Sequence, residues 1–94
     1  MSVTRITTLK FKSKEDADQV EETYKENAPS EFSEAEQLLE VRVDDLTLMF
    51  VSLYVDNDAM ERASAARSKR MDLNKDLIDS VDGKTGEVIL NHIK

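Results

Sequence analysis

The chain of 94 residues has the length of one small domain, and its 20 acidic against 13 basic side chains give a formal net charge of −7. Phosphate backbones and anionic lipid surfaces repel such a chain, so we expect no nucleic-acid partner and no membrane partner. The absence of cysteine excludes disulfides, iron–sulfur clusters and thiolate zinc sites, and it is compatible with a cytoplasmic location. The longest apolar stretch, Leu46 to Val55, is about half the length that spans a bilayer, and Met1 to Lys12 lacks the apolar core of a signal peptide. We therefore expect a soluble single domain over residues 1–94.

A strand and a helix are predicted in the first third of the chain. Residues Val3 to Phe11 are rich in β-branched side chains and alternate in polarity, with Val3, Thr7, Leu9 and Phe11 on one face. Ser13 suits a helix N-cap, and the next apolar residues recur at spacings of three and four up to Pro29, where we expect the helix to end. The members of this narrow apolar stripe are Ala17, Val20, Tyr24 and Ala28.

The next segment predicts a second strand with one polar face. After an acidic connector over residues 30–36, Leu39, Val41 and Val43 alternate with Glu40 and Arg42. Two aspartates at positions 44 and 45 suit a tight turn that leads into the following strand. We expect Glu40 and Arg42 to face solvent.

The stretch from Leu46 to Val55 predicts a strand that is apolar on both faces. Leu48, Phe50 and Tyr54 share one face, and the other face carries Met49, Val51, Leu53 and Val55. Such a strand must be covered twice. Because two helices cover only one face of a sheet, the second face needs a partner molecule or a ligand. This pattern is our main reason to expect a homodimer.

The last third of the chain predicts a long helix, a turn and a strand. Asp56, Asn57 and Asp58 suit an N-cap, and apolar residues keep to one arc of a helix from Asn57 to Val81. The segment Asp82 to Gly86 has the composition of a turn-rich link, and Glu87 to Lys94 is expected to form the last strand.

The element order predicts an α+β, ferredoxin-like βαββαβ fold, in which a four-stranded antiparallel sheet carries both helices on one face. In this order, in the doubly apolar strand and in the long helix, the whole chain resembles the dimeric α/β-barrel superfamily. That superfamily includes antibiotic-biosynthesis monooxygenases, small isomerases and stress-responsive barrel proteins. The resemblance implies a homodimer formed sheet to sheet, with a pocket in each subunit. It rests on architecture and implies no particular reaction.

Arg67, Arg70 and Asn74 are the most informative polar residues, because on a helical projection they fall inside the apolar arc. A charge placed there needs a partner. One interpretation is that these arginines bind the anionic group of a ligand lying between helix 57–81 and the sheet. The alternative is that they reach the rim or pair with acidic residues of the chain or of its partner.

From these features we predict a homodimer that binds a small, largely apolar, anionic molecule such as a fatty-acid-like acid. Apolar lining and flexible methionines suit such a ligand. The predicted lining residues are Leu48, Phe50, Met60, Met71, Leu77 and Ile78. Partial matches to a calcium loop and a phosphate-binding loop lack the glycines that those motifs require, so we expect no metal ion and no cofactor.

Two other functions fit the same sequence. In a cofactor-independent monooxygenase or isomerase, the pocket is an active site in which His92 or Tyr54 moves a proton. In a structural or interaction dimer, the helix packs on the sheet without a cavity. A tightly filled core favours the dimer without a cavity, whereas a pH-dependent rate that needs His92 favours the enzyme.

Overall fold

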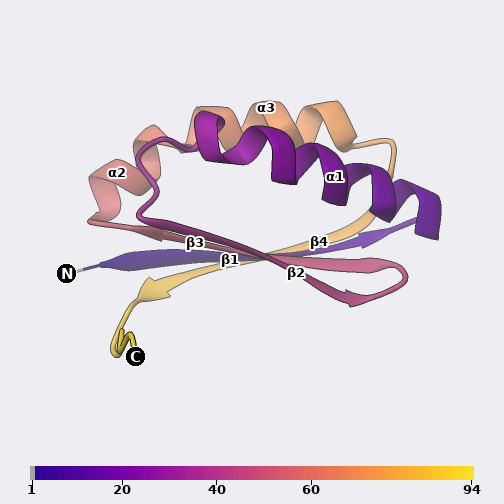
Figure 1. Cartoon of the computed structure of the whole chain (residues 1–94). Coiled ribbons are helices and arrows are strands. Elements are labelled where there is room, and N and C mark those ends of the chain that lie inside the picture. Colours follow the sequence, from indigo (N-terminus) through magenta and orange to yellow (C-terminus); the bar gives the residue numbers. More distant parts are fainter. Residues whose placement is uncertain (1) are drawn as a thin grey trace.

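The computed structural model describes residues 2–94 and places its helices on one face of a four-stranded antiparallel sheet (Figure 1). The strand order in the sheet is β2-β3-β1-β4. This is the predicted βαββαβ ferredoxin-like arrangement, and the prediction is confirmed. The elements are β1 Val3–Phe11, α1 Lys14–Glu31, β2 Gln37–Asp44, β3 Thr47–Tyr54, α2 Asn57–Arg62, α3 Ser64–Asn74 and β4 Ile78–Glu87.

The first strand and the first helix follow the sequence pattern closely. The predicted face of β1 is buried, and so are all four residues of the predicted stripe on α1. The Ser13 side chain caps α1 by accepting a hydrogen bond from the Asp16 N–H at 3.1 Å. The prediction that this helix ends at Pro29 is wrong, because α1 continues to Glu31. A proline in the last turn removes only its own donor, and the N–H of Phe32 still bonds to the Ala28 carbonyl at 2.8 Å.

The hairpin of β2 and β3 decides which sheet face each strand residue occupies. In β3 the buried residues alternate with half-buried ones, and Phe50 lies opposite Glu40 of β2. Glu40 and Arg42 therefore face the helices, and the prediction that they face solvent is wrong. For Arg42 the physical reason is that α1 supplies acidic partners, since Arg42 Nη1 bonds to Asp18 at 2.9 Å and Glu21 at 2.8 Å.

The outer face of the sheet, away from the helices, is consequently apolar along β2 and β3. Within the single chain, Leu39 is 46% exposed, Val41 44% and Val43 54%. On β3 the side chains of Met49, Val51 and Leu53 are half-buried on this same face. We define the outer sheet face by its exposed apolar residues, which are Ile6, Leu39, Val41, Val43 and Val55.

The prediction of one continuous helix from Asn57 to Val81 is wrong, both because the helix is divided and because it ends earlier. It is divided at Ala63 into α2 and α3, and α3 ends at Asn74. Ile78 and Val81 instead belong to β4, where they lie opposite Phe11 and Leu9 of β1. Aliphatic residues at these positions fit a helical arc and a strand equally well, and the backbone pairing with β1 decides for the strand.

The predicted last strand is also displaced, because β4 contains the segment predicted as a link and only Glu87 of the predicted strand. Gly83 pairs with Thr7 and Gly86 with Thr4, so both glycines lie within the ladder. A Cβ atom on Gly83 would stand 3.4 Å from Arg67 Nη2, so this glycine lies directly opposite the Arg67 guanidinium. The ladder between β1 and β4 ends at the pair of Val3 and Glu87. Residues 88–94 have no regular secondary structure.

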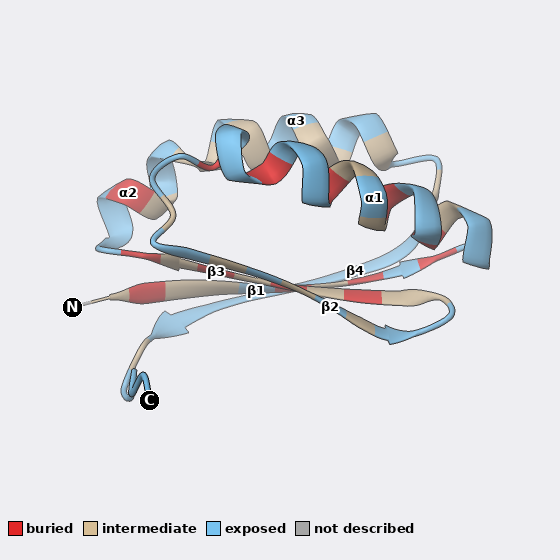
Figure 2. Cartoon of the chain, in the orientation of Figure 1, coloured by how far each residue is buried: buried red, intermediate tan, exposed pale blue. Residues whose placement is uncertain are grey.

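The core lies between the helices and the inner sheet face, where Figure 2 shows the buried residues. The largest fully buried side chains are Phe11, Val20, Leu48 and Tyr54. In the described part of the chain, residues 2–94, no helix combines the length and the apolar character needed to cross a membrane.

Candidate functional site

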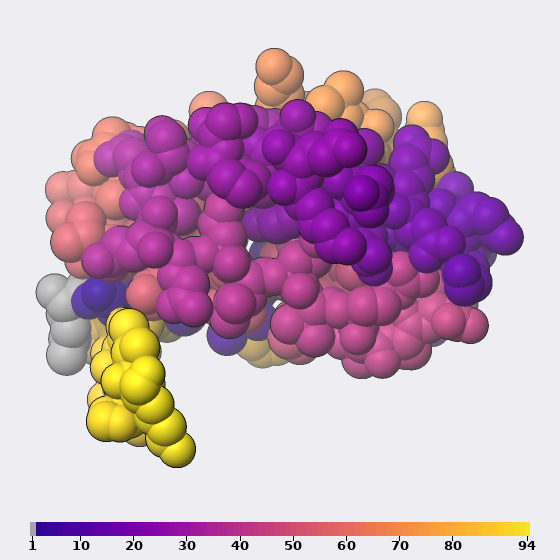
Figure 3. Space-filling view, viewed as in Figure 1, coloured from indigo at the N-terminus to yellow at the C-terminus, as the bar shows by residue number. Residues whose placement is uncertain are grey.

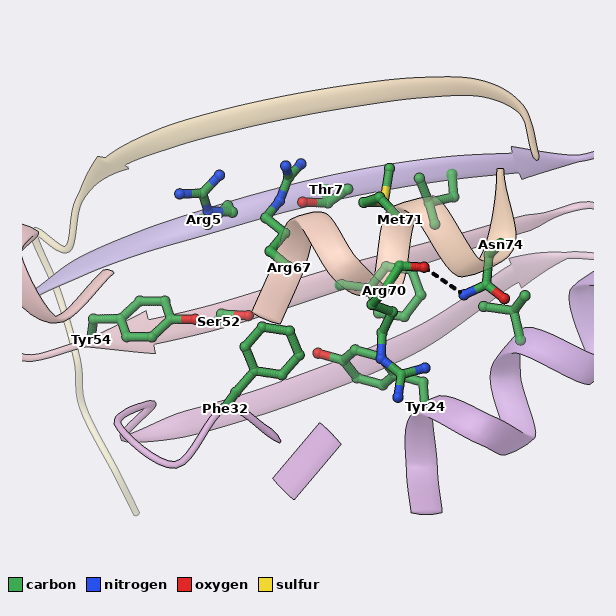
Figure 4. Close-up of a pocket in the computed structure, with 13 residues that line it drawn as sticks. Arg5, Thr7, Tyr24, Phe32, Ser52, Tyr54, Arg67, Arg70, Met71 and Asn74 are labelled. Carbon is green, nitrogen blue, oxygen red and sulfur yellow. Dashed lines mark hydrogen bonds between the residues drawn. The ribbon is translucent and has the colours of Figure 1, made fainter. Parts of the chain in front are cut away.

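A pocket lies between α1, α3 and the inner face of the sheet (Figure 4). Its cavity volume is about 50 Å³, within about 520 Å³ of space that includes open solvent. Its walls combine aromatic, aliphatic, hydroxyl, amide and guanidinium groups. The lining residues are Arg5, Thr7, Leu9, Val20, Tyr24, Phe32, Phe50, Ser52, Tyr54, Arg67, Arg70, Met71 and Asn74.

Aromatic rings form one wall of the pocket. Tyr24 of α1 packs on Phe50 of β3 with ring centroids 4.5 Å apart and ring planes at 58°. Phe32, which follows α1, has its centroid 6.3 Å from that of Tyr24. Rings tilted in this way pack favourably and present an apolar surface to the interior of the pocket. This wall suits the hydrocarbon or ring portion of a ligand.

Arg70 is one of three arginines on the pocket, and its charge is balanced within the chain. Its guanidinium donates from Nε to Glu31 Oε1 at 3.1 Å and from Nη2 to Glu31 Oε2 at 3.0 Å. The Arg70 side chain is 12% exposed and its ζ-carbon lies 5.7 Å from the Tyr24 ring centroid. The pairing of Arg70 therefore follows the alternative that the sequence left open, an acidic partner in the same chain.

Arg67 and Arg5 have no such partner. Among residues 2–94, no carboxylate forms an ion pair with either guanidinium, whereas Arg42, Arg62 and Arg70 are all paired. Figure 4 shows Arg5 and Arg67 together on the side of the pocket nearest β1, while Arg70 points toward Tyr24. Burial lowers the pKa of Arg67, and the positive charge of Arg5 lowers it further. The pocket thus contains two guanidinium groups, those of Arg5 and Arg67, with which no carboxylate among residues 2–94 forms an ion pair.

The other polar groups of the pocket are neutral and can donate hydrogen bonds. Burial raises the pKa of Tyr24 to about 12, and the neighbouring Ser52 hydroxyl opposes this effect. Burial also raises the pKa of Tyr54, so both phenols keep their protons at neutral pH. The Asn74 amide donates to the Arg70 carbonyl at 3.1 Å. Cations and hydroxyl donors together suit an anionic, acceptor-rich group.

The structure brings together about half of the residues predicted for the site. The predicted residues that line the pocket are Phe50, Tyr54, Arg67, Arg70, Met71 and Asn74. Leu48 is fully buried in the core instead, and Leu77 and Ile78 pack against the same core. Met60 packs on the smaller cluster around Val3 and Tyr54. His92 is exposed in the segment 88–94 and lies outside the lining.

The sequence interpretation missed Arg5, Tyr24 and Ser52 as lining residues. Strand alternation could have predicted Arg5 and Ser52, because each lies an even number of positions from the apolar residues on the inner face of its strand, β1 or β3. Tyr24 was assigned to the helix core, and nothing in its spacing indicates that its ring edge borders a cavity.

Glu40 lies next to the pocket, beneath α1, without contributing to the lining. Both of its carboxylate oxygens are buried and have no hydrogen-bond partner among residues 2–94. Burial, together with the negative charge of Glu21, raises the pKa of Glu40 to about 7. Glu22 adds to this effect, while Lys25 and Arg70 oppose it. Glu40 also helps to raise the pKa of Tyr24.

Within residues 2–94, no three histidine, aspartate or glutamate side chains are grouped so that they could hold a metal ion.

The fold is shared with solved structures of low sequence identity. A dimeric ferredoxin-like protein from an uncultured marine organism has 12% identity and a TM-score of 0.81 over 99% of this chain and 92% of that one. A putative antibiotic biosynthesis monooxygenase from Chloroflexus aurantiacus has 9% identity and a TM-score of 0.80, over 98% and 97%. SnoaB, a cofactor-independent oxygenase from Streptomyces nogalater, has 15% identity and a TM-score of 0.67, over 96% and 95%.

No protein-family model matches the chain, and no curated protein matches it. The chain is therefore a ferredoxin-like α+β protein with the architecture of dimeric ferredoxin-like and antibiotic-biosynthesis-monooxygenase-like proteins. Identities of this size establish the shared fold and no activity.

Proposed function

We propose that the protein is a homodimer that binds a small molecule with an apolar body and an anionic end, such as a fatty-acid-like carboxylate, in the pocket beneath α3. One observation carries the proposal. Arg67 and Arg5, with which no carboxylate among residues 2–94 forms an ion pair, bring positive charge to a pocket that also has aromatic and aliphatic walls. A partly buried guanidinium without a counter-charge is unfavourable, and a ligand carboxylate would remove that cost.

The ligand carboxylate would accept hydrogen bonds from the planar guanidinium of Arg67, an arrangement that is often bidentate. The Arg5 charge would add to the attraction, and bound anions would relieve the repulsion between the two arginines. The apolar body would then lie against Phe50, Met71 and Val20, all of which line the pocket. Methionine adapts its shape readily, which suits a ligand of irregular outline.

The homodimer is supported by the outer sheet face. On β2 that face exposes aliphatic side chains, while the polar residues of the strand point toward the helices. A strand face in contact with solvent usually shows the opposite arrangement. Packing of two such faces would bury them, and a dimeric protein shares the fold. A two-fold arrangement uses the same surface on both subunits.

A cofactor-independent monooxygenase or isomerase is the second candidate, because SnoaB and a putative antibiotic biosynthesis monooxygenase share the fold. Such an enzyme needs a group that accepts a proton beside the substrate. Tyr24 and Tyr54 keep their own protons, and His92 is outside the lining. The composition of the lining therefore favours binding over proton transfer.

The test is a calorimetric titration of the protein with decanoate and with decan-1-ol, which has the same chain without the charge. We expect Arg67→Gln to weaken decanoate binding by roughly 10- to 100-fold, because a hydrogen bond to a charged group contributes about 1.5–3 kcal/mol. Binding of decan-1-ol should change little. Native mass spectrometry of the purified protein, before titration, would identify any ligand that it already carries.

Arg62→Gln is the matched control, because Arg62 is paired with Glu34 on the surface and lies outside the pocket. It should leave decanoate binding unchanged. Equal binding of decanoate by the wild type, Arg67→Gln and Arg5→Gln would contradict anchoring by these arginines. Recovery of the ligand in an oxidised or isomerised form would instead support the enzyme.

A further inference from the structure

Three hydroxyl groups meet on the wall of the pocket that β3 and α1 form. Ser52 and Tyr54 lie two positions apart on β3, so their side chains share the inner sheet face, and Tyr24 comes from α1. Figure 4 shows the hydroxyl groups of Tyr24 and Tyr54 directed toward Ser52 from opposite sides. In Figure 3 the atoms of α1 lie across the front of the molecule, and all three residues are buried. We call Tyr24, Ser52 and Tyr54 the hydroxyl cluster.

The hydroxyl cluster has more donors than it can use internally. Burial raises the pKa of both phenols, and the Ser52 hydroxyl is close enough to each of them to oppose that rise. Two contacts through Ser52 use at most two of the three protons, because each hydroxyl group carries one. At least one O–H group is therefore left without an acceptor in the cluster. A buried donor in this state is unfavourable, and an acceptor atom on a ligand would remove the cost.

The hydroxyl cluster lies next to the arginines that attract the anionic end of the ligand. Ser52 is the direct neighbour of Arg5 across the ladder of β1 and β3, and side chains in such pairs begin about 5 Å apart. Burial raises the pKa of Tyr54, whereas the positive charges of Arg5 and Arg67 both oppose the rise, so Tyr54 lies within reach of both charges. An atom bound by the cluster must therefore lie within a few carbon atoms of the ligand carboxylate.

We propose that the hydroxyl cluster is a second polar subsite, which donates hydrogen bonds to a ketone or hydroxyl oxygen a few carbon atoms from the carboxylate of the ligand. The ligand is then an oxo or hydroxy acid and not a plain fatty acid. This inference rests on the proposed function, because it assigns a second group of the ligand in the same pocket. The apolar remainder of the ligand lies against Phe50 and Met71, which line the pocket beside the cluster.

Calorimetric titrations with three acids of equal chain length test the subsite. Decanoate, 4-oxodecanoate and 9-oxodecanoate share a carboxylate, and they differ only in the presence and place of a ketone. We expect the wild type to bind 4-oxodecanoate roughly 3- to 10-fold more tightly than decanoate, which is the gain that a neutral hydrogen bond gives. The 9-oxo acid should bind no more tightly than decanoate, because its ketone would lie among apolar walls.

The gain should depend on the hydroxyl cluster. In the variant Tyr24→Phe/Ser52→Ala/Tyr54→Phe, which keeps both rings, the affinities for 4-oxodecanoate and decanoate should become equal. Each comparison is made between two ligands on one variant, so a general loss of affinity cancels. Ser80→Ala is the matched control, since Ser80 is exposed on β4 outside the lining and should preserve the gain. A gain that survives in the triple variant would overturn the subsite.

Infrared spectroscopy tests the same subsite on the wild type, without any substitution. The ketone of each oxo acid is labelled with ¹³C, so that its stretching band is separated from the amide bands of the protein. A hydrogen bond weakens the C=O bond, so the band of bound 4-oxodecanoate should lie at lower frequency than the band of bound 9-oxodecanoate. Equal frequencies for the two bound acids would overturn the subsite.

The outcomes separate the subsite from the anion site. A wild type that binds none of the three acids would overturn both proposals. Equal affinities for the three acids, all weakened by Arg67→Gln, would overturn the subsite and leave the anion site standing. A preference for 4-oxodecanoate that needs the hydroxyl cluster, with affinities that Arg67→Gln and Arg5→Gln leave unchanged, would overturn the anion site and support the subsite.

Discussion

Glu40 shows how one residue can depart from its sequence pattern. Strand alternation correctly separates Glu40 and Arg42 from the aliphatic residues of β2, but it does not state which face the helices cover. Arg42 can lie on the inner face because it pairs with Asp18 and Glu21 of α1. Glu40 has no equivalent cation in contact, and its oxygens remain without hydrogen bonds within residues 2–94.

Stability should depend on pH through Glu40. Its pKa is about 7 in the folded chain against an ordinary value of 4.5, so the folded state holds the proton more tightly than the unfolded state. The free energy of unfolding should therefore fall as the pH rises from about 4.5 to about 7, and this loss persists above that range. After allowance for solvent screening, the loss is about 1–2 kcal/mol.

Glu40→Gln removes this ionisation and should make the protein more stable than the wild type at pH 8, with little difference at pH 4.5. Urea unfolding at both pH values measures the effect. Glu61→Gln is the control, because Glu61 is exposed on α2, is not among the charges that shift the pKa of Glu40, and should not alter the pH dependence. A pH dependence that Glu40→Gln leaves unchanged would show that the carboxyl is ionised normally.

At the scale of elements, caps were predictable and the junction between α3 and β4 was not. Ser13 and the residues around Asp56 carry cap signals that the structure uses. The division at Ala63 has no proline or glycine that would predict it from the sequence. Leu73 belongs to the predicted apolar arc and yet is 72% exposed. Ile78 and Val81 are strand residues because β1 offers them a pairing edge, which is a non-local cause.

The cap of α2 gives a test at this scale. Asp56 accepts a hydrogen bond from the Ala59 N–H at 2.8 Å. Asp56→Ala should lower the free energy of unfolding by about 1 kcal/mol, because the helix loses a side-chain partner for an N–H that has no partner within the helix. Asp56→Asn should retain most of the stability, since asparagine caps about as well as aspartate. Equal losses in the two variants, measured by urea unfolding, would assign the effect to charge and not to the cap.

At the scale of the whole molecule, the sequence predicts both the doubly apolar strand β3 and the fold. The candidate site was readable only in part. Arg67, Arg70 and Asn74 share the sheet-facing side of α3 because they follow a spacing of three and four. Which of the two arginines would find a carboxylate was not readable, since Glu31 reaches Arg70 only through the packing of α1 against α3.

The outer sheet face gives a test of the assembly. Val41 is 44% exposed in the single chain, so Val41→Asp should leave the fold of the subunit intact. In a sheet-to-sheet homodimer, the same change places an unpaired charge in the interface and should weaken association by roughly 100-fold or more. Sedimentation velocity measures this, and circular dichroism checks the fold. Leu73→Asp, on the helix side, should leave association unchanged, and a Val41→Asp protein that dimerises normally would assign the interface to another surface.

The contrast between a negative molecule and a positive pocket affects the kinetics of ligand entry. With a net charge of −7, the chain repels an approaching anion at long range, whereas Arg5 and Arg67 attract it only near the pocket. Salt screens charges beyond about 8–10 Å, so added salt relieves the long-range repulsion more than it weakens the sheltered contact at the guanidinium groups. Ionic strength would then accelerate association, which is the reverse of ordinary electrostatic steering. A simple inorganic anion meets the same repulsion without gaining from the apolar walls, so the molecule discriminates against small ions by the affinity that those walls add.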